Sequence, residues 1–315
     1  MTELLATTSQ NYLEAQCRGV LGDAIKQQGT PYAPITMVTT DPVQTVRLSY
    51  ANTIFPLEAF TGSVHRISSG IAEKSITATH YAGGIFIPAD AVQFDQTGQL
   101  NIGSLGNALS SAMPGIVEAV QAEIAYAVWY QVANGHTYDD WLDDAAAGTY
   151  TFDDGHSWAP IGTYTTAQDN MGSTAFAEAE LGVAIAKMRR FKGPFGKPLR
   201  MNPTHLLVPP ELEIAARKLV AATSNGEQKT FNALPPLEVV PVAEFTELDW
   251  WMICDAGKAS MKPVIVHIPE TRANGLPNPR VNVNYDEDAD GYKVDLHLDY
   301  AVALGPWPFW YAETV

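Results

Sequence analysis

The strongest hydrophobic pattern in the chain runs from Gly103 to Asn134. Apolar residues recur there every three or four positions: Leu105, Leu109, Met113, Ile116, Val117, Val120, Ile124 and Val128. This spacing predicts one long helix with a single apolar face. Ser104 can cap its start and Gly135 can end it. Pro114 lacks the N–H that a helix uses, so it predicts a kink or the start of a second helix.

The chain before this helix shows two different patterns. Residues 2–28 fit a short amphipathic helix, and the next stretch carries Pro31, Pro34 and Pro42 among β-branched residues. Each proline disfavours helical geometry in the residue before it, so this stretch is predicted to be an extended strap. We expect the strap not to be a core element, but to wrap its own surface or reach a neighbouring molecule.

Residues 43–99 alternate apolar and polar positions and are interrupted by glycines, which is typical of β-strands. Their modest apolar content predicts a long, half-exposed hairpin, with Phe86 in its last strand. His65 and His80 are expected at the surface or in cross-strand contacts rather than as ligands.

The segment 136–171 is rich in Asp, Gly, Thr and aromatic residues and predicts an irregular loop. Its aspartates invite a calcium-site interpretation, but Ca²⁺ needs six to eight oxygen ligands that converge on one point. Nothing in the spacing enforces that convergence, so a solvated acidic loop is favoured.

The second half of the chain alternates short strands and helices. A helix is predicted over 173–191, capped by Ser173 or Thr174, with late basic residues at its end. A buried strand at 206–208 leads into another helix, and a proline-flanked strand follows at 234–240. Two buried strands joined by a turn are then predicted over 248–268, and two long alternating strands surround the acidic turn DEDADG.

Composition limits the functional class. The chain of 315 residues holds 35 acidic and 19 basic residues, a net charge of −16, so nucleic-acid binding as the main role is disfavoured. No apolar run reaches the ~20 residues that cross a bilayer, and the N-terminus does not resemble a signal peptide. Two cysteines are too few for a disulfide framework, so a cytoplasmic, reduced environment is expected.

Enzyme motifs are missing from the sequence. There is no GxSxG elbow, no HExxH, no GxGxxG and no phosphate-binding GxxxxGK[ST]. Asp286, Asp288 and Asp290 match the first half of a calcium-binding EF-hand loop, but His297 stands where the bidentate Glu is needed. A plain hairpin turn is favoured for these residues, and no catalytic residue, metal or cofactor is predicted.

Four features of the second half resemble the major capsid protein of tailed bacteriophages with the Hong Kong 97 fold, in particular the Mu-like major head subunit family, gpT. These are the strand and helix of LLVPPELEIAARKL, the proline-flanked strand at 234–240, the KPVIV strand at 262–266, and the acidic turn that enters a strand ending in aromatics at 307–311. An arm, a hairpin and a long helix precede them in the order of the same plan.

The resemblance implies an α+β fold of the Hong Kong 97 type and a division of the chain. The implied parts are an N-terminal arm (1–42), an E-loop with flanking strands (43–100), a peripheral domain (101–200) with spine helix 103–134 and acidic insertion 136–171, an axial domain (201–265), and a return to the peripheral domain (266–315). It also implies assembly elements, for which we select Pro31, Pro34, Pro42, Phe86 and Pro114.

By the same resemblance, the protein would be a structural subunit of pentamers and hexamers in an icosahedral shell around phage DNA, assembled in the host bacterial cytoplasm. Scaffolding, portal and decoration proteins are possible partners, and no membrane is involved. Removing residues 1–42 would then leave soluble protein that forms no closed shells. Two alternatives stay open: an encapsulin-like nanocompartment shell, and a soluble metal-binding or hydrolytic α+β domain.

Overall fold

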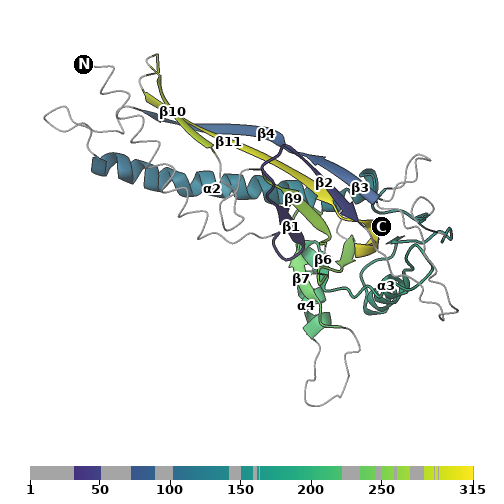
Figure 1. The fold of residues 1–315 in the computed structure, drawn as a ribbon. Coiled ribbons are helices and arrows are strands. Elements are labelled where there is room, and N and C mark those ends of the chain that lie inside the picture. The colour runs from purple at the N-terminus through teal and green to yellow at the C-terminus, as the bar shows by residue number, and fades with distance from the viewer. Residues whose placement is uncertain are drawn as a thin grey trace.

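The computed structural model describes residues 32–50, 72–88, 102–141, 150–158, 162, 164–221, 235–245, 250–258, 261–269, 280–286, 288–289 and 291–314. Helices and strands are both present, and the strands form two larger sheets and one two-stranded sheet. Figure 1 shows an elongated half, in which a long helix runs beside long strands, and a more compact half below and to one side of it. The part of the chain that is described contains no helix long and apolar enough to cross a membrane.

The predicted long helix is α2 (Ile102–Ala133). It is one uninterrupted helix, about 48 Å long at 1.5 Å per residue, so the alternative of a second helix starting at Pro114 is wrong. The side chain of Pro114 lies outside the described residues. Toward the C-terminal end, Ile124 and Val128 are fully buried, as the apolar spacing predicted, and Val132 one turn later is buried as well.

The elongated half is built by β4 (Thr79–Pro88), β10 (Arg280–Asp286) and β11 (Gly291–Leu304). β11 is the central strand and pairs antiparallel with both neighbours. Alternate residues of β11, from Tyr292 to Tyr300, are buried, and the helix α2 contacts this strand. The two long alternating strands around an acidic turn are therefore confirmed, and their apolar face has its partner within the chain.

A second hairpin precedes this sheet. β2 (Thr45–Tyr50) pairs antiparallel with β3 (Ala72–Thr77), and only two residues of each strand are buried. The half-exposed hairpin predicted over 43–99 is confirmed in these strands, except that β4 leaves it and joins β11 instead. The residues 51–71 between the two strands lie outside the described residues.

The compact half contains a five-stranded sheet in the order β5 (Met171–Gly172), β12 (Trp310–Glu313), β8 (Trp251–Cys254), β6 (His205–Val208) and β7 (Glu238–Pro241). The turn η3 (Pro210–Leu212) and the helix α4 (Glu213–Ala221) connect β6 to its parallel neighbour β7. β6, β8 and β12 are buried at every position, which is typical of strands covered on both faces.

The helix predicted over 173–191 begins later than expected. α3 spans Glu178–Arg190 and starts after Ala177, which has extended backbone and no side-chain cap. Thr174 does not cap it, because the N-cap position is Ala177; the backbone N–H of Thr174 instead donates to Oε2 of Glu313 at 2.8 Å. The capping prediction was wrong, whereas the late basic residues do lie in the last turn.

The two buried strands predicted as neighbours lie in different sheets. β8 pairs with β6 and β12, whereas β9 (Val264–His267) pairs with β11 and with β1 (Thr36–Thr39). Both strands are buried throughout, so neither has a polar face that would indicate its sheet. The pattern therefore predicted the strands correctly but not their partners.

The strap is part of the core, contrary to our expectation. β1 pairs in parallel with β9, and Tyr32 and Ile35 just before it are buried. His267 fastens its end, with Nδ1 3.1 Å from Oγ1 of Thr39 and Nε2 2.8 Å from the carbonyl oxygen of Val43. Prolines exclude a helix but are tolerated beside an edge strand, and both described prolines flank β1. Pro34 is half-buried, Pro42 is exposed, and Pro31 lies outside the described residues.

The acidic segment 136–171 is also anchored in the core. Trp141, Phe152 and Trp158 are buried, and Oδ1 of Asp140 accepts the backbone N–H of Trp307 at 2.9 Å. The solvated loop expected from composition is wrong for these residues, because the aromatic side chains bury large apolar areas while aspartates such as Asp154 stay exposed. Residues 142–149 lie outside the described residues.

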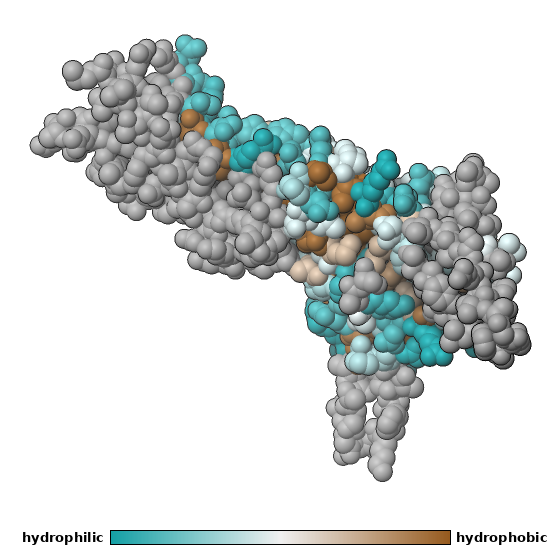
Figure 2. All heavy atoms as spheres, in the orientation of Figure 1, coloured by the Kyte–Doolittle hydropathy of each residue, from teal (hydrophilic) through white to brown (hydrophobic). Residues whose placement is uncertain are grey.

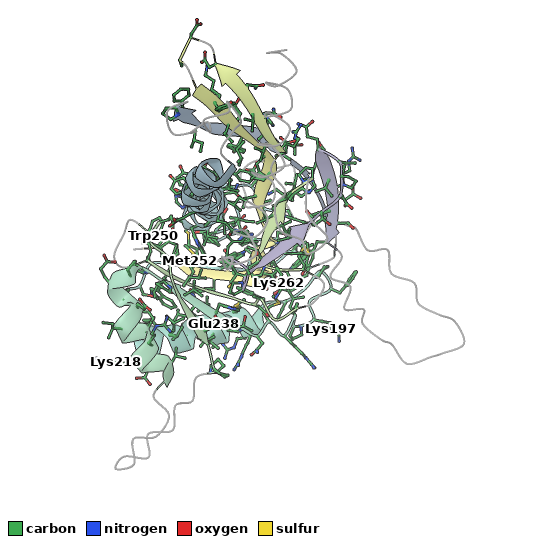
Figure 3. The ribbon with its side chains drawn as sticks, turned by 90° about the vertical axis from the view of Figure 1, so that its left-hand side faces the viewer. Lys197, Lys218, Glu238, Trp250, Met252 and Lys262 are labelled. Carbon is green, nitrogen blue, oxygen red and sulfur yellow. The ribbon has the colours of Figure 1, made fainter. Side chains whose placement is uncertain are left out.

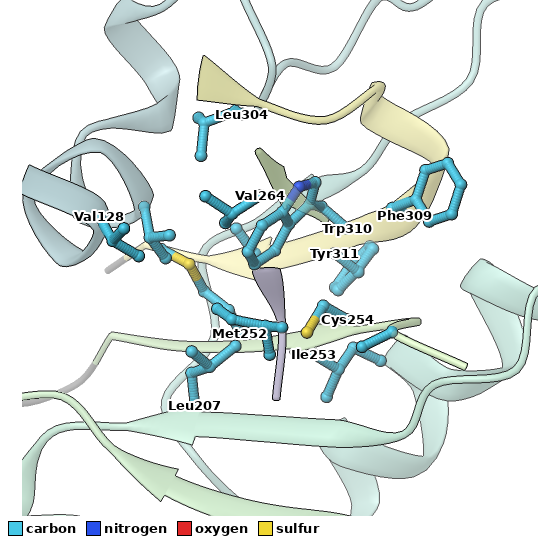
Figure 4. Close-up of a cluster of buried hydrophobic side chains, with 14 of the residues drawn as sticks. Val128, Leu207, Met252, Ile253, Cys254, Val264, Leu304, Phe309, Trp310 and Tyr311 are labelled. Atoms are coloured by element: carbon cyan, nitrogen blue, oxygen red, sulfur yellow. The ribbon is translucent and has the colours of Figure 1, made fainter. Parts of the chain in front are cut away.

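One core joins both halves of the molecule. Figure 4 shows Val128 of α2, Val264 of β9 and Leu304 of β11 on one side of Trp310, with Met252 of β8 below it. The C-terminal chain makes this connection by leaving one sheet at Leu304 and entering the other at the start of β12, through the short turn η4 (Trp307–Phe309). The arrangement predicts that substitutions in β1 and in the acidic segment affect the same folded unit.

His156 is a fully buried titratable group of this core. Its ring stacks on Trp307 with centroids 4.5 Å apart, and Nε2 lies 2.9 Å from Oδ1 of Asn170. The amide nitrogen of Asn170 donates to the carbonyls of Thr151 and Trp307, so its oxygen must accept and His156 carries its proton on Nε2. Burial lowers the pKa of His156 from 6.5 to about 4.

Replacing Ile35 by Ala tests whether the strap belongs to the folded unit. Ile35 is 0% exposed, so we expect a loss of about 2–5 kcal/mol in the free energy of unfolding, measured by urea titration. Val38→Ala in the adjoining strand β1 is the control, because Val38 is 37% exposed and should change stability by less than about 1 kcal/mol. Equal, small effects of both variants would mean that β1 is not packed as described.

The buried His156 predicts a loss of stability in acid. Between pH 6.5 and about 4 the unfolded chain binds a proton that the folded chain does not, so stability is full above pH 6.5 and falls on acidification. The loss is at most about 3 kcal/mol, at 1.36 kcal/mol per pKa unit. His156→Gln should remove this part of the pH dependence in thermal or urea unfolding, whereas His80→Gln, an exposed control, should keep it. An unchanged slope in His156→Gln would assign the acid loss to other groups.

Candidate assembly surfaces

The outer face of the long sheet is polar and exposed. Residues of β4 and β11 that point away from α2 are paired across the strands, as His80 is with Asp299 and Phe86 is with Lys293. Phe86, selected from the sequence as an assembly element, is 44% exposed on this face. Figure 2 shows the surface of the elongated half as mostly hydrophilic, with separate hydrophobic patches. An exposed aromatic on such a face is a candidate contact residue.

A hydrogen-bonded network crosses the three strands on this face. Oδ1 of Asp299 accepts from Nδ1 of His80 at 2.5 Å, and Nη2 of Arg280 donates to Oδ2 of the same carboxylate at 3.1 Å. Nε2 of His80 lies 3.1 Å from Nδ1 of His297. His80 is therefore a cross-strand residue, in agreement with the sequence interpretation. The spacing of His297 and Asp299 two residues apart on one strand was a signal for this network that we did not use.

The acidic turn at the tip of β10 and β11 is a hairpin turn. The carboxylate of Asp286 accepts the backbone N–H groups of Asp288 and Ala289 at 3.1 and 3.4 Å, and it also forms an ion pair with Lys293. The hydrogen bond from Lys293 lowers the pKa of Asp286. Asp286 is therefore occupied by the turn and not free for a cation, while Asp290 lies outside the described residues. No three His, Cys, Asp or Glu side chains of the described ranges are grouped to hold a metal ion.

A basic groove lies at the C-terminal end of α3. It has a volume of about 290 Å³, and its walls include Tyr164, Gln168, Arg190, Phe191 and Lys192. The sequence analysis placed the late basic residues here at the end of a helix, where cations are favourable. The structure adds the segment 164–169, which closes the other side of the groove.

The nearest arrangement to a catalytic site is structural. Oγ1 of Thr204 lies 2.8 Å from Nδ1 of His205, whose Nε2 is 3.3 Å from Oε2 of Glu238, a residue labelled in Figure 3. The Thr204 hydroxyl also accepts the N–H of Ala256 at 2.9 Å, and His205 is buried, which lowers its pKa. These contacts hold β6 against its neighbouring strands, and the Thr204 hydroxyl is engaged by the backbone at Ala256.

The described cysteine does not have the environment of a nucleophile. Cys254 is fully buried in β8, and burial raises the pKa of its thiol well above the ordinary value. Reactive cysteines have lowered pKa values and partial exposure, so Cys254 is a packing residue.

Comparisons with known proteins agree with this architecture. The sequence matches the family model described as phage capsid protein over residues 72–312. No curated protein matches the sequence.

Solved structures share the fold at low sequence identity. A chain of the bacteriophage JBD30 procapsid matches with a TM-score of 0.53 and 14% identity, covering 97% of this chain and 74% of that chain. A phage-related protein from Bordetella bronchiseptica RB50 has the same TM-score and identity and covers 94% and 95%. The SrpI encapsulin of Synechococcus elongatus PCC 7942 matches with a TM-score of 0.50 and 8% identity, covering 91% and 88%.

These matches confirm the expected α+β fold of the Hong Kong 97 type. The family match extends over most of the 315 residues, from the start of β3 into the last described strand, β12. The protein therefore belongs to the phage capsid protein family.

Proposed function

We propose that this protein is the major capsid protein of a tailed bacteriophage, which assembles into pentamers and hexamers of an icosahedral shell around DNA. The observation that carries the proposal is the family match over residues 72–312. The net charge of −16 supports it, because the inner wall of such a shell must not hold the packaged polyanion tightly. Ring contacts that repeat head-to-tail close into pentamers and hexamers.

The finer assignment to the Mu-like gpT family rests on the order of elements in the second half of the chain. In this proposal the long sheet and α2 form the peripheral domain, and the β6, α4 and β7 region points toward the capsomer centre. Within this proposal we assign β1 to the subunit's own sheet rather than to the arm that we expected over 1–42, because β1 pairs with β9.

The partners and location follow from the same proposal. The subunit's main partner is itself, with scaffolding, portal and decoration proteins as further partners in a virion capsid that assembles in the host bacterial cytoplasm. No catalytic role is proposed, since the Thr204–His205–Glu238 contacts and the buried Cys254 have structural explanations.

A nanocompartment shell is the second candidate, favoured by the structural match to an encapsulin. The two candidates differ in what the shell encloses, namely DNA or a protein cargo. They share the subunit fold, so the contents of purified particles must decide between them.

Electron microscopy of the purified full-length protein, with light scattering on the same sample, tests the proposal. We expect closed icosahedral particles, or rings of five and six subunits, over some range of salt. Particles recovered from infected or induced cells should contain nuclease-protected DNA, whereas a co-purifying enzyme inside the shell would favour the nanocompartment. Protein that stays monomeric at every salt concentration, with and without its co-expressed head proteins, would contradict both.

Phe86→Ser tests the exposed aromatic as a contact residue. Because Phe86 is already 44% exposed, we expect little change in the stability of the subunit. Loss of a side chain worth about 1.5–3 kcal/mol on burial should raise the protein concentration needed for assembly about tenfold or more. Tyr150→Ser is the matched control, since Tyr150 is an exposed aromatic (39%) on the acidic segment. Identical assembly curves for the wild type and Phe86→Ser would remove Phe86 from the interface.

A further inference from the structure

Basic residues are concentrated in one stretch of this acidic protein. Six of the 19 Lys and Arg residues lie between positions 187 and 200: Lys187, Arg189, Arg190, Lys192, Lys197 and Arg200. All except Lys187 are exposed, and Figure 3 shows Lys197 at the outer edge of the molecule. With 35 acidic residues available in the chain, such cations would ordinarily find carboxylates nearby.

Most of these cations have no carboxylate partner in the described part of the chain. Lys187 is satisfied by Asp169 at 3.3 Å and by the Tyr311 hydroxyl at 2.7 Å, and Arg189 donates to the side-chain oxygen of Asn202. Arg190, Lys192, Lys197 and Arg200 form no ion pair with any described carboxylate. The cluster therefore has positive charge available for a carboxylate from outside.

Two of the unpaired cations line the groove at the end of α3. Arg190 and Lys192 form its basic wall, with the rings of Tyr164 and Phe191 beside them. The Lys192 ammonium lies 5.2 Å from the centre of the Tyr164 ring, which holds it at the groove. A guanidinium and an ammonium together suit carboxylates, which the guanidinium can bind through two N–H groups. The groove is too small for a folded element but fits a projecting turn.

A long polyanion is a poor occupant. The groove also contains Asp169, and the surrounding protein has a net charge of −16, which repels an extended nucleic acid. A short acidic turn needs to meet only the groove itself. A short protein segment is therefore the favoured occupant of the groove.

The acidic turn of this same chain has the required form. It is the densest acidic run in the sequence, DEDAD at 286–290, and it caps the projecting hairpin of β10 and β11. Asp286 is occupied by Lys293 and the turn, whereas the side chain of Asp288 is exposed. In Figure 1 this tip lies at the opposite end of the molecule from α3, so the two can meet only between copies.

We propose that the basic groove of one subunit binds the acidic turn of a second subunit, with Asp288 facing Arg190 and Lys192. Because the two surfaces differ and lie at opposite ends, the contact is heterologous and repeats from subunit to subunit. The proposal rests on the proposed shell function and names a contact within it.

Charge exchange between the two surfaces tests this contact in the assembling full-length protein. We expect the double variant Arg190→Glu/Lys192→Glu to raise the concentration needed for assembly at least tenfold, and Asp288→Lys to do the same. Combining all three substitutions should restore most of the assembly. Glu118→Lys, at an exposed position on α2, is the control acid and should not restore it. Normal assembly of the double variant, or equal rescue by Glu118→Lys, would overturn the proposal.

A binding measurement separates this inference from the shell function. A fluorescent peptide of residues 282–294 should bind the full-length protein in fluorescence anisotropy, and high salt should weaken the binding. Arg190→Glu/Lys192→Glu should weaken it at least tenfold, while Lys218→Glu, an exposed control on α4, should not. If the peptide does not bind but a DNA oligonucleotide binds through Arg190 and Lys192, the groove is a nucleic-acid site and the proposal is wrong. Peptide binding by a protein that never assembles would support the groove and contradict the shell.

Discussion

The fold depends on an aromatic corner where the C-terminal chain passes between the two large sheets. The ring of Trp307 stacks on His156 and contacts the ring of Phe191, and the backbone N–H of Trp307 donates to Oδ1 of Asp140, so three separate segments meet at one residue. Trp310 donates from its indole nitrogen to the carbonyl of Pro263 at 3.1 Å. Because both indoles bury large apolar areas and that of Trp310 also hydrogen-bonds the chain, the corner aligns both sheets at once.

Close packing at this corner restricts the backbone that leads into it. A Cβ on Gly305 would lie 2.5 Å from the carbonyl oxygen of Lys262, so only glycine lets β11 approach β9 this closely. Buried apolar side chains from α2, both large sheets and the acidic segment pack in one internal core, which contains most of the buried apolar residues. What remains outside is mostly polar: the outer face of the long sheet, the hairpin tip and the groove beside α3.

The sequence predicted the helices and strands whose formation depends on the residues within them. The three- to four-residue spacing from Leu105 to Val128 predicted α2, and the alternation around DEDADG predicted β10 and β11. The sequence did not predict which strands pair. β8 and β9 are apolar throughout, so neither pattern indicated that the two strands lie in different sheets. The acidic segment was wrongly predicted to be solvated because its aspartates outnumber the three aromatic residues that anchor it in the core. The groove was not predicted because it forms only when residues 164–169 fold against α3.

The exposed features separate into two physical kinds, with different consequences for a shell. Phe86 offers an apolar contact whose strength changes little with ionic strength, because burial of apolar area is not screened by salt. The groove and the turn at Asp288 offer opposite charges, whose attraction is screened beyond about 8 Å at physiological ionic strength. If both proposed contacts form, the ionic contact would be reversible with ionic strength while the apolar contact persists. Ionic strength would then determine which subunit contacts can break and re-form while a shell assembles.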